Sequence, residues 1–105
     1  MTFVIAVNYG SRDEITRAVR KIMTDVENGK IAPEDMTEKV FASYLDTAGI
    51  PDPDLMIRTS GELRLSNYLL WQLAYSELYV TECLWPDFNK EELLNAIRQY
   101  NKRER

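Results

Sequence analysis

The sequence contains no histidine and only one cysteine, which removes several kinds of site. Without histidine, the chain itself cannot supply a Ser–His nucleophile or an imidazole metal ligand. The lone Cys83 excludes an internal disulfide and a cysteine-based zinc site, and we expect it to be a small, buried apolar residue.

Long apolar runs and an excess of basic residues are lacking as well. The apolar run Phe3–Val7 is far too short to cross a bilayer, so we expect neither a signal peptide nor a membrane span, and any membrane contact should be peripheral. The net charge is −4, and the basic residues between positions 12 and 30 alternate with acidic ones, which argues against a nucleic-acid partner. These features predict a soluble, cytoplasmic protein.

The 105 residues, 45% of them hydrophobic, suffice for one small domain, for which we expect the bounds 1–105. Predicted strands and helices alternate, which favours an α/β fold with a parallel sheet and crossover helices. Residues 2–9 form a nearly continuous apolar run, as expected of a strand covered on both faces. The other predicted strands are 54–57 and 77–81, and the predicted helices are 11–28, 33 or 37 to 46, 68–74 and one from 89 onward.

Helix boundaries are indicated by capping residues. Ser11 and Glu14 have the spacing of a capping box, and Asn28-Gly29 should end that helix. Asn89 and Glu92 have the same spacing before the final helix. Four residues are expected to build the sheet–helix core and the subunit contact: Trp71, Trp85, Pro86 and Phe88.

The stretch 58–67 has the composition of a phosphate-binding loop. Arg58 and Arg64 each offer a planar fork of donors, and two forks suit a diphosphate. Hydroxyls and free backbone N–H groups would complete the shell, and Ser66 or Asn67 could begin a helix whose N-terminus attracts anions. The loop would follow a strand at its carboxyl end, where α/β sheets usually bind ligands.

Simpler interpretations of these residues stay open. Arg58 and Arg64 could pair with acidic neighbours on a solvated loop, namely Glu62, Asp52 or Asp54. Asn8 and Tyr9 could face the ligand from the end of the first strand, or could belong to a tight turn that needs Gly10. Glu62 could orient either arginine.

Several motifs together resemble the cis-prenyltransferases, the family of undecaprenyl diphosphate synthase (isoprenyl transferase). They are Val7–Arg12, Ala48–Leu55, Ile57–Glu62, Arg64–Gln72, Ala74–Tyr79 and Leu84–Phe88. The resemblance implies a partial version of that fold, and an enzyme that condenses isopentenyl diphosphate with an allylic diphosphate to form cis-polyprenyl diphosphate. It also implies a homodimer.

The resemblance assigns roles to particular residues. Arg58, Arg64, Leu65 and Ser66 match the family residues at the diphosphate of isopentenyl diphosphate. Glu77 matches the glutamate that binds the family's Mg²⁺ cofactor, although it could instead pair with Arg58 or Arg64.

The family's N-terminal segment, which carries the aspartate that works with magnesium, has no counterpart in this sequence. We therefore expect a C-terminal portion that has no catalytic residue of its own and is inactive alone. Two alternatives stay open: a non-catalytic interaction subunit, and a generic phosphate-binding α/β module.

Overall fold

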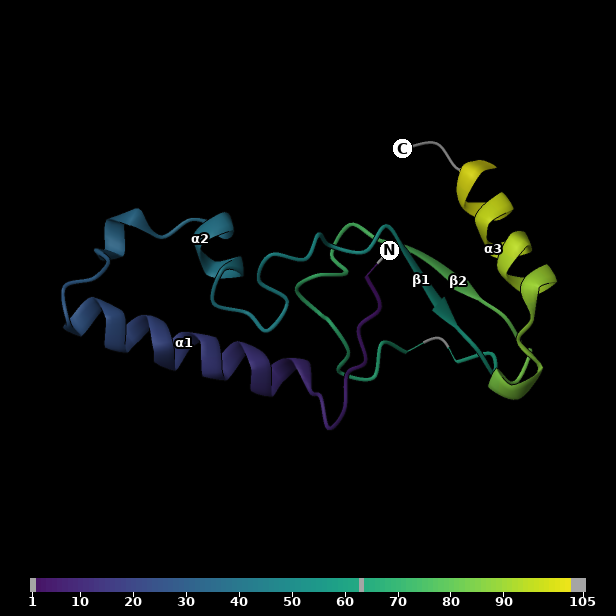
Figure 1. Ribbon diagram of the computed structural model, residues 1–105, viewed down its shortest axis with the longest axis horizontal. Coiled ribbons are helices and arrows are strands. Elements are labelled where there is room, and N and C mark those ends of the chain that lie inside the picture. The colour runs from purple at the N-terminus through teal and green to yellow at the C-terminus, as the bar shows by residue number, and fades with distance from the viewer. Residues whose placement is uncertain (1, 63, 103–105) are drawn as a thin grey trace. The chain divides into compact units, whose positions relative to one another are not determined.

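The computed structural model describes residues 2–62 and 64–102 (Figure 1). Its contacts divide the chain into two compact units, Met1–Pro51 with Asn67–Leu70, and Asp52–Ser66 with Trp71–Arg105. The helices are α1 (Ser11–Glu27), α2 (Glu38–Ala42) and α3 (Lys90–Lys102), with short 3₁₀ turns at Pro33–Asp35 and Trp85–Asp87; the strands are β1 (Leu55–Arg58) and β2 (Glu77–Val80). In the described ranges, no helix combines the length and the apolar character needed to cross a membrane.

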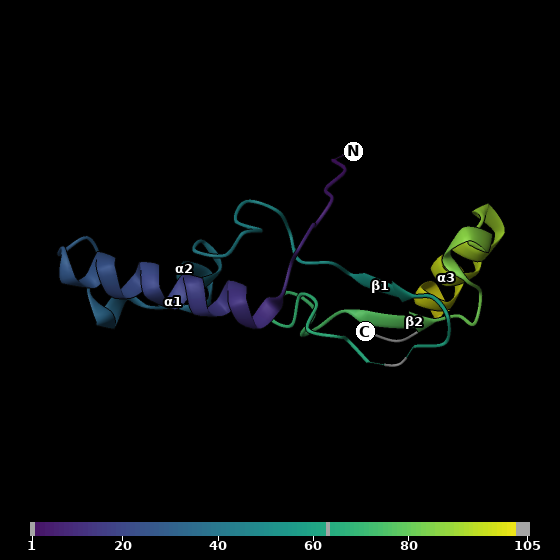
Figure 2. The same ribbon diagram turned by 90° about the horizontal axis from the view of Figure 1, so that it is seen from below.

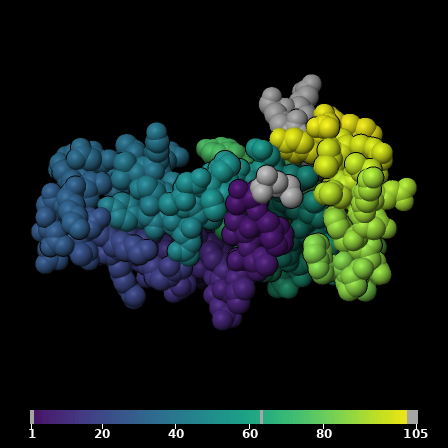
Figure 3. Space-filling model, viewed as in Figure 1, coloured from purple at the N-terminus to yellow at the C-terminus, as the bar shows by residue number. Residues whose placement is uncertain are grey.

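The first unit contains α1 and α2, and α2 lies on one side of α1 (Figures 1 and 3). Its buried apolar side chains include Ala18 on α1 and Leu45 after α2, at 1% and 4% exposure. The ion pair of Arg17 with Asp46, 2.8 Å between Nη2 and Oδ2, also joins the two segments. The predicted second helix is shorter than expected, because α2 ends at Ala42 and turns follow.

The predicted capping box at the start of α1 is wrong. Ser11 is already helical, and its Oγ accepts a hydrogen bond from the Leu70 amide at 3.0 Å. Glu14 is buried, and its carboxylate accepts from the Tyr9 hydroxyl and, at 2.8 Å, from the Asp46 amide. Both side chains are therefore taken up by residues outside the first turn of the helix.

The predicted end of α1 is confirmed. Asn28 is the C-cap residue, and its amide donates to the Thr24 carbonyl at 3.0 Å. Gly29 follows with φ +72°, a left-handed conformation that glycine adopts without steric cost.

The second unit contains a two-stranded parallel sheet with α3 beside it (Figure 2). In its register Leu55 lies opposite Glu77, and Arg58 lies opposite Val80. The Glu92 carboxylate on α3 accepts from Tyr79 and Thr81 of the β2 region, at 3.5 and 3.4 Å. This arrangement confirms the α/β class with a parallel sheet.

One of the two capping interactions predicted at the start of α3 is present. The Asn89 Oδ1 atom accepts from the Glu92 amide at 3.0 Å. The Glu92 side chain, however, does not return to the start of the helix but reaches the β2 region, so only half of the predicted box is confirmed.

The strand predicted over residues 2–9 is wrong. None of the described residues in this range is in a strand, and Phe3, Ile5 and Val7 are 81%, 71% and 76% exposed. A strand needs a hydrogen-bonded neighbour, and in the described part of the chain β1 and β2 pair only with each other. In the described part of the chain, the apolar run therefore has no strand partner, which accounts for its extended, exposed backbone.

The helix predicted over residues 68–74 is also wrong, because the chain makes turns there. Ser66, Asn67 and Leu69 have φ values of +52°, +61° and +47°, whereas an α-helix needs φ near −63°. The helix N-terminus expected to attract an anion at Ser66 or Asn67 consequently does not exist.

Two predictions about burial need correction as well. Trp85 is 71% exposed and stacks on Phe88 with 5.7 Å between ring centroids, so it lies at the surface of its unit and not in the core. Cys83 is only half-buried, and burial together with nearby Glu92 raises the pKa of its thiol.

Candidate functional site

Arg58 lies at the end of β1, where the backbone is fixed by the sheet. Its carbonyl accepts from the Thr81 amide at 2.9 Å. Its Nη2 atom donates to the Ser66 Oγ atom at 3.4 Å, while its Nε atom is buried and has no hydrogen-bond partner among the described residues. A buried donor without an acceptor costs about 1–3 kcal/mol, so this guanidinium is prepared to bind an anionic oxygen.

The backbone of the loop after Arg58 is held by the β2 side of the sheet. The Ser60 amide donates to the Cys83 carbonyl at 2.9 Å, and the Gly61 amide donates to the Thr81 carbonyl at 2.8 Å. These two amides are therefore occupied, and the expectation that free backbone N–H groups complete a phosphate shell is wrong for them. A phosphate at the start of this loop would therefore be bound by side-chain donors and not by these two amides.

Arg64 is held by Glu62 in a forked arrangement. Arg64 Nε lies 3.0 Å from Glu62 Oε1, and Arg64 Nη2 lies 3.4 Å from Oε2. The hydrogen bond from Arg64 lowers the pKa of Glu62, with a smaller contribution from the charge of Arg58. Arg64 therefore pairs with an acidic neighbour, as the simpler interpretation of the loop predicted. Arg58 forms no ion pair with any of the described residues.

The four residues assigned to the diphosphate are brought together only in part. Arg58 and Ser66 are in contact, and Arg64 lies in the same loop with its side chain 82% exposed. Leu65 is half-buried between Arg64 and Ser66. Their substrate roles stay predictions.

Glu77 lies at the other end of the sheet from Arg58. It is the first residue of β2, and its amide donates to the Asp54 carbonyl at 2.9 Å. Arg58 lies opposite Val80, three residues further along, which is about 10 Å at the rise of a strand. Among the described residues, no three acidic or cysteine side chains gather as a metal site.

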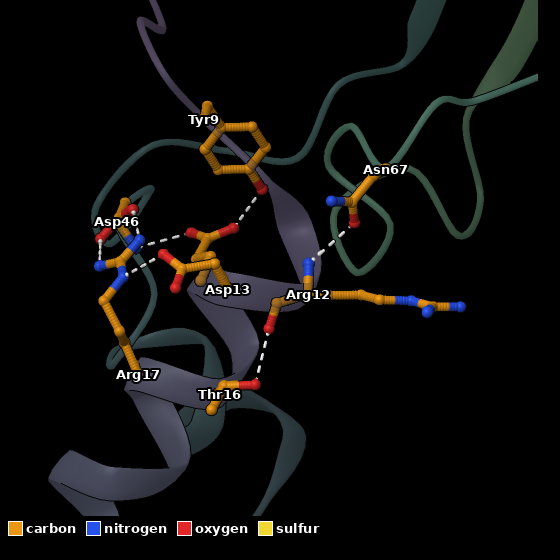
Figure 4. Close-up of polar contacts among 8 residues, drawn as sticks. Tyr9, Arg12, Asp13, Thr16, Arg17, Asp46 and Asn67 are labelled. Carbon is orange, nitrogen blue, oxygen red and sulfur yellow. Dashed lines mark hydrogen bonds and ion pairs between the residues drawn. The ribbon is translucent and has the colours of Figure 1, made fainter.

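The Asn8–Tyr9 turn belongs to the first unit. The Tyr9 hydroxyl donates to Glu14 (Figure 4). The Tyr9 ring meets the Tyr68 ring edge to face, with 5.5 Å between the ring centroids. Burial, followed by the bond to Glu14, raises the pKa of Tyr9 to about 12. These contacts favour the structural interpretation of Tyr9. A Cβ atom at Gly10 would lie 3.0 Å from the Asn67 Nδ2 atom, so a larger residue there would require the Asn67 side chain to shift.

Asn67 has a role that sequence analysis missed. Its carbonyl accepts from the Ser11 amide at 2.8 Å, and its Oδ1 atom accepts from the Arg12 amide at 2.9 Å (Figure 4). Asn67 therefore caps α1 from 55 residues away. The only local signal was the residue type, since asparagine tolerates a left-handed backbone.

Comparison with known proteins agrees with the motifs. The sequence model for undecaprenyl diphosphate synthases matches residues 1–105. The isoprenyl transferase of Chlamydia trachomatis is 54% identical over all of this chain and 42% of its own length, and that of Geobacillus kaustophilus is 60% identical over 95% of this chain and 39% of its own.

A solved structure is similar too. The lavandulyl diphosphate synthase of Lavandula x intermedia, in complex with dimethylallyl diphosphate, has a TM-score of 0.91 and 47% identity over 95% of this chain and 43% of its own. The chain thus spans about two fifths of the length of the proteins it matches. It belongs to the undecaprenyl diphosphate synthase family of prenyltransferases.

Proposed function

We propose that this chain supplies the isopentenyl diphosphate-binding part of a cis-prenyltransferase. The complete enzyme would condense isopentenyl diphosphate with an allylic diphosphate to form cis-polyprenyl diphosphate. Membership of the family supports this proposal, and so does the similarity to a synthase solved with dimethylallyl diphosphate.

The observation that carries the proposal is the state of the Arg58 side chain. Its buried Nε–H group lacks an acceptor among the described residues, and its Nη2 atom lies against the Ser66 hydroxyl. A phosphate oxygen would satisfy the Nε–H group, while a second oxygen could accept from Ser66. The loop amides of Ser60 and Gly61 are occupied, so the anion would be bound by this side-chain pair and not by those two amides.

The remaining residues would share the diphosphate. Arg64 would offer its fork to the second phosphoryl group, and the half-buried Leu65 would lie beside the bound diphosphate. Holding the diphosphate at two points would orient the alkene of isopentenyl diphosphate toward the allylic carbon, where positioning accelerates the reaction.

Magnesium is the cofactor that the family implies, and Glu77 fits it as a single ligand. Mg²⁺ prefers oxygen ligands, and it commonly binds one or two carboxylates together with substrate phosphates and water. The described residues provide no cluster of three such groups, so the other ligands would be diphosphate oxygens and a carboxylate from outside these residues. When bound, the ion would neutralise diphosphate charge.

We also propose that the protein works in the cytoplasm as a homodimer. Exposed apolar side chains in the second unit support self-association; they are Leu84, Trp85, Leu94 and Ile97. The same exposed groups could give peripheral contact with a membrane that holds the polyprenyl product.

Titration calorimetry of this chain with isopentenyl diphosphate tests the proposal. Arg58→Ala should weaken binding by about 1.5–3 kcal/mol, or roughly 10- to 150-fold, because a hydrogen bond to a charged group is lost. Arg98→Ala is the matched control, since Arg98 lies on α3 and bonds only its neighbour Asn95 among the contacts described. The control should bind as the wild type does.

Two outcomes would change the proposal. Equal binding by the Arg58→Ala variant and the wild type would contradict the role of Arg58. Equal affinity for ADP and for isopentenyl diphosphate would indicate a generic phosphate-binding module. If mixing this chain with the N-terminal part of a relative produced prenyl transfer, the result would support the proposal that the chain is part of a prenyltransferase.

A further inference from the structure

Glu62 occupies the groups of Arg64 that a phosphate would use. Its two carboxylate oxygens face the Nε and Nη2 atoms of Arg64, at 3.0 and 3.4 Å, and Oε1 also accepts from the Arg64 amide at 3.3 Å. A carboxylate and a phosphate engage a guanidinium through the same pair of parallel hydrogen bonds. A diphosphate that takes the fork of Arg64 must therefore replace Glu62.

We propose that Glu62 is an internal competitor that holds Arg64 and is displaced when a diphosphate binds. This inference rests on the proposed function of the loop. It assigns to Glu62 a role in setting the affinity for diphosphate and the ease of its release, in addition to any effect on the orientation of Arg64.

The exposure of the pair makes such an exchange feasible. The Arg64 side chain is 82% exposed and that of Glu62 is 36% exposed, so water screens their attraction. Exposed ion pairs contribute little, and the usual range corresponds to a factor of about 1.4 to 5 in an equilibrium constant. A diphosphate carries more charge than a carboxylate and can therefore win the exchange.

The Arg58 side chain provides a second reason for the competition. Its Nε and Nη2 atoms are free of carboxylates in the described part of the chain, and Ser66 is its one hydrogen-bond partner there. A diphosphate can therefore engage Arg58 first and compete for Arg64 afterwards. Because Glu62 pairs with Arg64 and no described carboxylate pairs with Arg58, the two phosphoryl groups would bind one after the other.

Removing the carboxylate tests the inference. We would titrate inorganic diphosphate into this chain and into the variants Glu62→Gln, Arg64→Ala and the double variant. Glu62→Gln should bind diphosphate about 1.4- to 5-fold more tightly, because glutamine competes less well for a guanidinium. In the Arg64→Ala background the same change should bring no gain.

Glu82→Gln is the matched control for the general effect of one negative charge. The Glu82 side chain lies beside the same loop, where its Cγ atom would be 3.6 Å from a Cβ at Gly61, and the described residues show no ion pair between it and Arg64. Neutralising Glu82 should change the affinity for diphosphate less than neutralising Glu62 does.

Weaker binding by Glu62→Gln would overturn the inference, since Glu62 would then only orient Arg64. An equal gain from Glu82→Gln, or a gain that persists without Arg64, would overturn it as well. If neither the wild type nor Glu62→Gln bound diphosphate, the proposed function would fail together with the inference. Binding by Glu62→Gln alone would support competition and require only the function of the wild-type chain to be revised.

Discussion

The cap that Asn67 places on α1 makes a specific prediction about stability. The Asn67 Oδ1 atom accepts from the Arg12 amide, one of the N–H groups that a helix cannot satisfy within its own first turn (Figure 4). The N-cap residue Gly10 supplies no side-chain bond of its own. Losing the Asn67 side chain should therefore leave the Arg12 amide without its acceptor.

Three substitutions separate the hydrogen bond from the backbone conformation. Asn67→Gly removes Oδ1 but keeps the φ of +61° accessible, so it should cost about 0.5–2 kcal/mol, the usual value of a helix cap. Asn67→Ala loses the same bond and adds about 1–2 kcal/mol for a left-handed residue with a Cβ atom. Asn67→Asp keeps the acceptor and places a negative charge near a helix N-terminus, which is favourable, so it should be close to the wild type.

Amide hydrogen exchange within α1 measures these effects locally. The protection of the amides near Arg12 should fall about tenfold for each 1.4 kcal/mol lost, in the order Asp, Gly, Ala. Wild-type exchange rates in the Gly variant would refute the cap, because the bond would then contribute nothing. Equal losses in all three variants would show that the acceptor is not the relevant atom.

Two further predictions concern pH. The pKa of Tyr9 is raised from 10.0 to about 12, so the stabilisation from its neutral hydroxyl is present below pH 10 and lost as the pH rises toward 12. Ultraviolet absorbance titration should show a late-ionising tyrosine that Tyr9→Phe removes, and persistence of that signal in the variant would contradict the assignment. The hydrogen bond from Arg17 lowers the pKa of Asp46 from 3.8, so the stabilisation from this ion pair is present above that pH and lost below it. Asp46→Asn should therefore cost up to about 1 kcal/mol at neutral pH and less in acid, measured by hydrogen exchange of α1. A difference that does not change with pH would contradict an ionic contribution.

Sequence patterns predicted elements whose determinants are local. The apolar spacing and the Asn28-Gly29 ending located α1, and Asn89 located the start of α3. The two paired strands were also predicted, because each is a short run of apolar residues with β propensity. In each case the residues that decide the structure lie within a few positions of one another.

The errors arose where distant residues decide the structure. The segment 68–74 has the apolar composition of a helix. The chain there makes contacts with the start of α1, and Ser66, Asn67 and Leu69 have left-handed conformations. Ser11 and Glu14 matched a cap pattern, yet they bond Leu70, Tyr9 and Asp46 instead.

The candidate site was predictable in composition but not in connectivity. The sequence indicated that arginines and hydroxyls gather after β1, and the structure places Arg58 against Ser66. Which arginine pairs with Glu62, and which keeps a donor without an acceptor, depends on side-chain geometry that no sequence spacing encodes.

The central claim, that the Arg58 Nε–H group takes up a phosphate oxygen, can be tested directly by nuclear magnetic resonance of arginine side chains. Isopentenyl diphosphate should shift the Nε–H signal of Arg58 and slow its exchange with water, while the signal of Arg98 on α3 stays in place. An unchanged Arg58 signal at a concentration of isopentenyl diphosphate that saturates the chain would contradict the claim.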